Sequence, residues 1–291
     1  MEIIKSIEAL RYRLKKSRAD GASIGFVPTM GFLHEGHLSL MRRARQENDL
    51  VVASIFVNPA QFGPNEDLAA YPRDAQRDTA LMQSVDVDVA FFPEAEEIYP
   101  QGFKSYVEVQ GPITQVLCGK SRPTHFRGVT TVVAKLFHLV APDKAYFGQK
   151  DAQQAVVIRQ MVRDLDFDLQ VVVCPIQREA DGLAMSSRNS YLSPQQRDDA
   201  VILYRSLREA ARRLQEGGRR SAKAVVQSIK KLIGTVPYAV IDYVEVVKAD
   251  DLTALETLDG EILIALAVKF GNTRLIDNLQ VDLRPQGHGG V

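Results

Sequence analysis

The chain has 291 residues, 45% hydrophobic and 25% charged, and its 36 Lys plus Arg are balanced by 36 Asp plus Glu. This composition is typical of a soluble globular protein long enough for two domains, and a net charge of zero creates no field that would attract nucleic acid or a membrane. No apolar run could span a bilayer, no secretion signal is visible, and Cys118 and Cys174 are far apart in the chain. We therefore expect a cytoplasmic protein with two reduced core thiols and no nucleic-acid or membrane partner.

Residues 1–176 alternate predicted helices with short apolar strands. Helices are expected at 4–19, 38–45, 71–85, 130–139 and 152–165. Strands are expected at 23–27, 50–57, 87–92, 144–147 and 169–173. Because buried strands that alternate with helices form parallel sheets covered on both faces, we predict a Rossmann-like α/β domain. A nucleotide bound to such a sheet lies beyond the carboxyl ends of its strands.

Residues 177–291 have a different pattern. Ser193, Pro194 and Gln196 form a capping box that begins a helix expected to run to Gly217-Gly218. A second helix at 222–233 is followed by strands at 241–247, 261–268 and 273–278. Their hairpin-like spacing predicts a smaller α+β domain with an antiparallel sheet. The Gly-rich residues 285–291 are expected to be disordered.

The motif His34-Glu-Gly-His37 stands between a predicted strand and a predicted helix. A helix start attracts anions, because its amides and the end of its dipole are positive. Two imidazoles three residues apart can reach the same anion as neutral donors or as cations. The motif favours a nucleotide phosphate. A structural turn and a metal site remain alternatives, although zinc needs three or four ligands and the cysteines are distant.

Lys150 lies in Phe147-Gly-Gln-Lys-Asp151, where a strand gives way to a helix. The helix dipole opposes a cation there, and a bound phosphate would compensate this cost. A solvated lysine beside a helix cap is the alternative that the segment leaves open. Gln154 is one turn further along the same predicted helix face.

Polar side chains also follow other predicted strands. Ser186, Ser187 and Arg188 offer two hydroxyls and a guanidinium fork to one anion, near the predicted domain boundary. Asn58 and Gln61 carry amides suited to a substrate with hydroxyls and a carboxylate, although Asn58 could simply form a turn with Pro59. The stretch 62–71 has little to bury and is a candidate mobile lid.

Together these segments resemble the pantoate–β-alanine ligases, or pantothenate synthetases. The resemblance covers nearly the whole chain, and it includes residues 120–128, Lys-Ser-Arg-Pro-Thr-His-Phe-Arg-Gly. It rests mainly on Pro28-Thr-Met-Gly31, His34-Glu-Gly-His37, Phe56-Val-Asn-Pro59 with Gln61, Phe147-Gly-Gln-Lys-Asp151 and Asp181-Gly-Leu-Ala-Met-Ser-Ser-Arg-Asn189. The HxGH motif alone is shared with nucleotidyltransferases and class I aminoacyl-tRNA synthetases. The segments around Gln61 and Lys150 are therefore more specific.

The resemblance implies that pantoate and β-alanine are condensed with ATP to pantothenate, AMP and pyrophosphate through a pantoyl adenylate. It implies these catalytic residues, with His37 as the acid for the leaving group: His34, His37, Lys150, Ser186, Ser187 and Arg188. It implies these ATP contacts: Met30, Gly31, His34, Gly36, His37, Gly148, Gln149, Lys150, Asp151, Gln177, Met185, Ser186, Ser187 and Arg188. It implies these substrate contacts, with Gln61 also near β-alanine: Pro28, Thr29, Asn58, Gln61 and Gln154. Mg²⁺ would be held chiefly by ATP oxygens rather than by a protein metal site, and the protein would be a cytoplasmic homodimer.

Two other functions compete with this interpretation. A nucleotidyltransferase would join a nucleotide to a phosphate substrate, whereas the ligase releases free AMP and requires an amine acceptor. A non-catalytic nucleotide sensor would bind ATP without turnover, but polar groups in four separate loops exceed what simple binding requires.

Overall fold

A computed structural model describes residues 1–64, 66–217 and 221–284. Contacts divide the chain into two compact units. The first unit comprises residues 1–114, 122–177 and 185–187, and the second comprises residues 115–121, 178–184 and 188–291. Because each unit takes segments from both sides of residue 176, a single division into domains 1–176 and 177–291 stays a prediction. The disorder expected at 285–291 and the expected helix stop at Gly218 lie outside the described residues.

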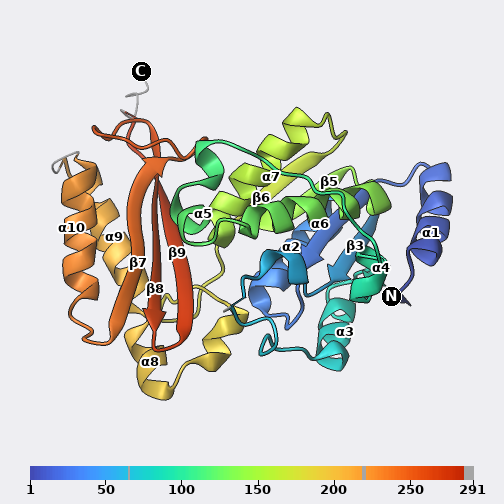
Figure 1. The fold of residues 1–291 in the computed structure, drawn as a ribbon, viewed down its shortest axis with the longest axis horizontal. Coiled ribbons are helices and arrows are strands. Elements are labelled where there is room, and N and C mark those ends of the chain that lie inside the picture. The colour runs from blue at the N-terminus through green and yellow to red at the C-terminus, as the bar shows by residue number, and fades with distance from the viewer. Residues whose placement is uncertain (65, 218–220, 285–291) are drawn as a thin grey trace, which may run out of the picture. The chain divides into compact units, whose positions relative to one another are not determined.

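A six-stranded parallel sheet forms the centre of the first unit, in the order β1-β4-β3-β2-β5-β6. Figure 1 labels β3, β5 and β6 of this sheet. Its strands are β1 (Glu2–Ile4), β2 (Ile24–Thr29), β3 (Leu50–Ile55), β4 (Val89–Phe91), β5 (Lys144–Gly148) and β6 (Gln170–Cys174). The strand order reverses at β2, which has β3 on one side and β5 on the other. The segments that contain His34 and Lys150 leave the carboxyl ends of β2 and β5, where sheets of this kind bind ligands.

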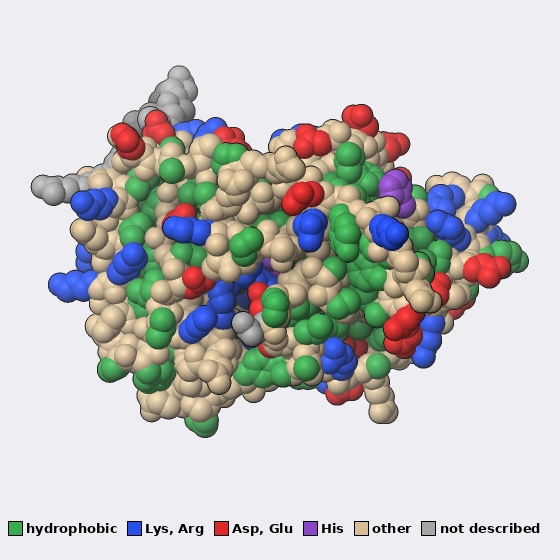
Figure 2. Space-filling model, viewed as in Figure 1, with side chains coloured by type: hydrophobic (Ala, Val, Ile, Leu, Met, Phe, Trp, Pro, Cys, Tyr) green, Lys and Arg blue, Asp and Glu red, His purple; other side chains and the backbone are tan. Residues whose placement is uncertain are grey.

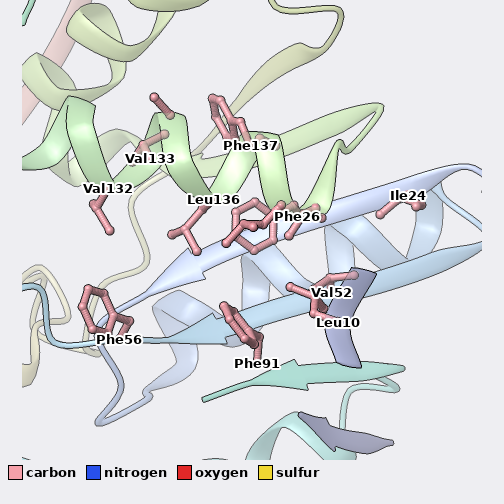
Figure 3. Close-up of a cluster of buried hydrophobic side chains, with 14 of the residues drawn as sticks. Leu10, Ile24, Phe26, Val52, Phe56, Phe91, Val132, Val133, Leu136 and Phe137 are labelled. Atoms are coloured by element: carbon pink, nitrogen blue, oxygen red, sulfur yellow. The ribbon is translucent and has the colours of Figure 1, made fainter. Parts of the chain in front are cut away.

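Helices cover both faces of this sheet and confirm the predicted Rossmann-like architecture. On one face, α1 (Ile7–Ala19), α6 (His125–Val140) and α7 (Ala152–Asp164) contribute to a shared apolar core. Figure 3 shows α6 side chains of this core gathered with those of β2, β3 and β4. On the other face, α2 (Glu35–Glu47) and α3 (Ala75–Gln83) bury Met41 and Met82. The short segments of this unit are η1 (Pro59–Gln61), α4 (Ala95–Ile98), η2 (Pro112–Thr114) and η3 (Gln149–Asp151).

Several boundaries in the first unit differ from the prediction. The helix predicted at 4–19 begins at Ile7, because the Ser6 side chain caps it. Residues 2–4 form the edge strand β1 instead, and three residues are too few for a periodic signal. The helix predicted at 71–85 spans only Ala75–Gln83, because the Asp74 side chain caps the Arg77 amide at 3.0 Å.

The second unit contains an antiparallel sheet, β7-β8-β9, which confirms the predicted α+β class (Figure 1). Its strands are β7 (Ala239–Lys248), β8 (Glu261–Phe270) and β9 (Thr273–Asp282). Their apolar residues share a core with α9 (Ile202–Gln215) and α10 (Ala222–Ile233). The short helix α5 (Leu117–Ser121) also belongs to this unit, and η4 (Ser187–Tyr191) begins in one unit and ends in the other.

The prediction of one continuous helix from Ser193 to Gly217 is wrong. The capping box at Ser193 starts α8 (Pro194–Asp199) as expected, but the helix stops there and α9 begins at Ile202. Between them the Leu203 amide donates to the carbonyl of Ala200, three residues back, at 3.1 Å. This tighter bond interrupts the α-helical pattern, and the fully buried Ala200 lies at the interruption.

The surface and the cysteines agree with the composition. Basic and acidic side chains are interspersed on the face shown in Figure 2. Cys118 and Cys174 are both buried free thiols, as predicted. Within the described residues, every helix is too short or too polar to cross a membrane.

A substitution at Gly128 tests how closely α6 approaches η1. A Cβ added at this glycine would lie 2.2 Å from the Ala60 carbonyl oxygen and 2.6 Å from the Gln61 amide nitrogen. We expect Gly128→Ala to lower the free energy of unfolding by about 2 kcal/mol or more, because backbone has to move. Urea unfolding measures this change. Gly148→Ala is the matched control, since its added Cβ meets no atom within 4 Å. Equal stability of the two variants would contradict the close approach.

Candidate active site

His34 and His37 cap the start of α2 reciprocally. His34 is the N-cap residue, and its Nδ1 accepts a hydrogen bond from the Gly36 amide at 3.1 Å. His37 Nδ1 accepts one from the His34 amide at 3.3 Å. A ring nitrogen that accepts carries no proton, so each neutral imidazole is protonated on Nε2. The ring centroids are 4.1 Å apart, and the two Nε2–H groups are the donors with which this pair can bind an anion.

Two amides at this helix start are already bonded within the protein. The Gly36 amide donates to His34, and the His37 amide donates to the His34 carbonyl at 2.8 Å. The helix start therefore presents imidazole N–H groups in place of these amides. Gly36 is required, because an added Cβ would lie 2.8 Å from the His34 ring.

Both imidazoles are neutral near pH 7. Burial is the largest cause that lowers the pKa of His34, to about 4, and the charge of Lys150 lowers it further. Burial also holds the pKa of His37 well below 6.5, with contributions from His34 and Lys150. The positive charge of Lys150 therefore acts on both rings. Lys150 is in η3, directly before α7, as the sequence predicted.

A buried carboxylate that the sequence analysis missed holds the loop before His34. Asp78 is on α3, is 1% exposed, and accepts hydrogen bonds from the amides of Phe32 at 2.8 Å and Leu33 at 2.7 Å. Gly31 has φ +84° and lies so close that an added Cβ would be 3.0 Å from Asp78 Oδ2. Desolvation raises the pKa of Asp78, although the two amides oppose this shift. A sequence signal existed: Asp78 lies one helical turn before the core residue Met82, on the face that packs inward.

Two hydroxyl side chains also hold the loop before His34. Thr29 Oγ1 donates to the Ser54 carbonyl at 2.8 Å and accepts from the Gly31 amide at 3.2 Å. Ser187 Oγ donates to the Phe32 carbonyl at 3.2 Å. The Ser187 side chain thus reaches the loop that leads to His34.

In the turn that follows β3, the strand beside β2, Asn58 orients Gln61. Its Nδ2 donates to Gln61 Oε1 at 2.8 Å and to the Gly128 carbonyl at 3.1 Å. Its Oδ1 accepts from the Ala60 amide at 3.2 Å and from the Tyr99 hydroxyl at 2.8 Å. These four bonds use the full capacity of the amide, and Asn58 is 1% exposed. A direct substrate contact of Asn58 stays a prediction, while its geometry positions Gln61.

The other predicted site residues have the following places. Gln61 Nε2 donates to Met30 Sδ at 3.2 Å, which joins the turn after β3 to the loop after β2. Pro28 is in β2, Gly148 ends β5, Gln149 and Asp151 are in η3, and half-buried Gln154 is in α7.

The Gln177 carbonyl accepts from the Met185 amide at 3.0 Å, and the Gln177 side chain lies beside Gly36. Ser186 belongs to the first unit and Arg188 to the second, so the contribution of Arg188 to the site stays a prediction.

In the part of the chain that the structure describes, no group of three or more His, Cys, Asp or Glu side chains could hold a metal ion. His34 and His37 use one nitrogen each to cap α2, which leaves one nitrogen per ring for any ligand.

Comparisons with known proteins agree along nearly the whole chain. A family profile described as pantoate-beta-alanine ligase matches residues 2–280. The pantothenate synthetase of Acetivibrio thermocellus is 56% identical over 283 residues, which cover 97% of this chain and 100% of that protein. The crystal structure of pantothenate synthetase from Thermus thermophilus matches with a TM-score of 0.92 and 47% identity, over 98% of this chain and 100% of that one. Pantoate-beta-alanine ligase from Francisella tularensis, complexed with beta-gamma ATP and beta-alanine, matches with a TM-score of 0.79 and 38% identity, over 96% and 97% of the two chains.

Asp78→Asn should weaken the loop before His34. An asparagine keeps one acceptor but turns an NH₂ group toward the second backbone amide, so we expect a loss of about 1–3 kcal/mol in unfolding free energy. We also expect weaker ATP binding by calorimetry. Asp74→Asn is the control on the same helix, because asparagine is an equally good N-cap. A variant at position 78 as stable as the control would remove the carboxylate from this role.

His34 should make stability depend on pH. Its pKa is about 4 in the folded protein and 6.5 ordinarily, so between these pH values the unfolded chain binds more protons. The stability that neutral His34 contributes is complete above pH 6.5 and is lost as the pH falls toward 4. His34→Asn keeps an N-cap without titrating, and we expect it to lose about 2–3 kcal/mol less than the wild type over this range. Urea unfolding at about pH 7.5 and about pH 4.5 tests this, with His138→Asn at an exposed site as the control. Identical pH profiles of wild type and His34→Asn would refute it.

Proposed function

The chain belongs to the pantoate–β-alanine ligase family, and we propose that its capped histidine pair and Lys150 form the centre at which ATP is attacked. The protein is an ATP-dependent ligase that forms pantothenate from pantoate and β-alanine. The observation that carries the proposed site is the position of His34, His37 and Lys150. All three follow the carboxyl ends of β2 and β5, at the switch point of the sheet.

In the first step, a pantoate carboxylate oxygen attacks the α-phosphorus of ATP. The bond from the α-phosphorus to the bridging oxygen breaks, and pyrophosphate leaves with that electron pair. Negative charge therefore grows on the phosphate oxygens. The Lys150 ammonium and the Nε2–H donors of His34 and His37 are suited to stabilise this charge, since the two rings are held in place before the reaction begins.

If His37 acts as the acid for the leaving group, the protonation state of its imidazole decides how it does so. Burial and neighbouring cations keep its imidazole neutral, so it enters the reaction as an Nε2–H donor rather than as an imidazolium. A bound polyphosphate raises the pKa of a nearby imidazole, because negative charge favours the protonated form. His37 can therefore assist the departure of pyrophosphate through a strengthened hydrogen bond, and complete proton transfer is not required.

In the second step, the β-alanine amine attacks the acyl carbon of pantoyl adenylate. The carbon–oxygen bond to AMP breaks, so AMP carries away the oxygen that came from pantoate, and the amine loses a proton. Gln61 and Gln154 are proposed to hold pantoate through its hydroxyls and carboxylate. Gln61 is suited to this role because Asn58 and Met30 orient its amide.

Magnesium, assembly and location remain parts of the proposal. Mg²⁺ would be held chiefly by ATP oxygens, as the family resemblance implies. When bound, it neutralises part of the phosphate charge. A homodimer in the cytoplasm is proposed from the family resemblance, and sedimentation of the purified protein would measure the assembly.

Isotope transfer tests the adenylate route. Pantoate labelled with ¹⁸O in its carboxylate should transfer one labelled oxygen to AMP when β-alanine is present, because the attacking oxygen leaves with the phosphate. Mass spectrometry of the nucleotide measures this transfer. ADP as the product, or AMP without the label, would reject the adenylate. A nucleotide joined stably to a phosphate substrate would favour a nucleotidyltransferase instead.

The same assay tests Lys150. We expect Lys150→Ala to slow pyrophosphate release by about 100-fold or more, because a cation facing the developing charge is lost, while the thermal unfolding temperature stays unchanged. Lys104→Ala, at an exposed lysine, is the matched control. Activity of Lys150→Ala near that of the control would exclude Lys150 from the mechanism.

A further inference from the structure

The segment 120–128 belongs to the family resemblance, yet the proposed reaction assigns it no task. Of its residues, Arg122 lies in the short connection between α5 and α6, and His125 begins α6. There α6 meets η1 so closely that Gly128 has no room for a Cβ. The side chains of Arg122 and His125 converge on one atom, the backbone carbonyl oxygen of Gln61.

His125 donates to that carbonyl. Its Nδ1 lies 2.9 Å from the Gln61 oxygen, and a carbonyl can only accept, so Nδ1 carries the proton. Its Nε2 lies 3.1 Å from Arg122 Nη1, and a guanidinium can only donate, so Nε2 accepts. The two contacts therefore fix the neutral Nδ1–H tautomer, the opposite of the tautomer in His34 and His37.

Arg122 is itself held in place. Its Nε donates to Glu66 Oε1 at 2.7 Å, and its Nη2 lies 3.3 Å from the Gln61 carbonyl oxygen. Burial is the main reason that the pKa of His125 falls to about 4, and the positive charge of Arg122 adds to this effect. Protonated His125 would lose its acceptor for Arg122, so the contacts and the neutral state support each other.

We propose that His125, oriented by Arg122 and Glu66, is a positioning residue for pantoate: it fixes the Gln61 backbone and thereby directs the Gln61 side chain. The inference rests on the proposed contact between Gln61 and pantoate. The turn needs such support, because its own closing bonds are long, 3.4 Å from the Gln61 amide to the Asn58 carbonyl and 3.3 Å from the Phe62 amide to the Pro59 carbonyl. Asn58 holds the Gln61 side chain, and His125 and Arg122 hold its main chain.

Two substitutions at His125 separate positioning from general stability. Asparagine can place an N–H donor near the position of Nδ1, whereas leucine cannot donate. We expect His125→Leu to raise KM for pantoate about 10-fold, the effect of one buried hydrogen bond, and to leave KM for ATP nearly unchanged. His125→Asn should stay within about 3-fold of the wild type for both substrates. An unchanged KM for pantoate in His125→Leu, or equal defects in both variants for both substrates, would overturn the proposal.

Gln61→Ala distinguishes this inference from the role on which it rests. If Gln61→Ala leaves KM for pantoate unchanged, the proposed pantoate contact of Gln61 fails. If Gln61→Ala raises that KM and His125→Leu does not, the positioning role alone fails. Both results can be obtained from the same steady-state assay.

Nitrogen NMR of the ¹⁵N-histidine-labelled protein tests the geometry without any activity measurement. We expect one imidazole in the neutral Nδ1–H form near neutral pH, and its signals should disappear in His125→Asn. His34 and His37, identified by their own asparagine variants, should show the Nε2–H form. A neutral His125 ring that is protonated on Nε2 under the same conditions would overturn the proposed contacts.

Discussion

The reciprocal capping of α2 by His34 and His37 is the interaction on which the rest of the site depends. Each ring gives its Nδ1 to a backbone amide at the helix start, so a structural bond determines which nitrogen is left to meet a ligand. The same bonds hold both rings in one orientation, so the proposed ATP site needs no rearrangement of these side chains. The site is thereby preorganised, which is how fixed dipoles stabilise developing charge without reorganisation.

Side chains outside the histidine pair hold the neighbouring loops in place. Asp78 holds the loop before His34, and Asn58 and His125 hold the turn that contains Gln61. At the far end of α2, the Tyr146 hydroxyl donates to Glu47 at 2.9 Å and accepts from Asn48 at 2.7 Å. Because Tyr146 is on β5, which leads to Lys150, this contact relates the histidine pair to the lysine through two rigid elements.

Within the second unit, a buried ion pair holds a loop in place. Arg178 donates to both oxygens of the buried Asp277 carboxylate, at 2.7 and 2.9 Å, and its guanidinium lies 3.9 Å from the centroid of the Tyr204 ring. This fork fixes the start of the loop 178–184 on β9 within that unit. Gly182, with φ +99°, allows the loop to turn where an added Cβ would overlap Tyr204.

Local patterns in the sequence were enough to determine the fold class and most strands and helices. Apolar periodicity and capping residues act over a few neighbours, so 222–233 was predicted as the observed α10 and the Ser193 capping box formed as expected. The HxGH, Gln61 and Lys150 segments likewise identified the ligase family by short-range order alone. Only the tertiary structure decided how these segments are supported. Asp78 lies 45 residues from Leu33, and His125 lies 64 residues from Gln61. The tautomers of the three histidines and the split between α8 and α9 also depend on partners in space, because a hydrogen bond between distant residues leaves no periodic trace in the chain.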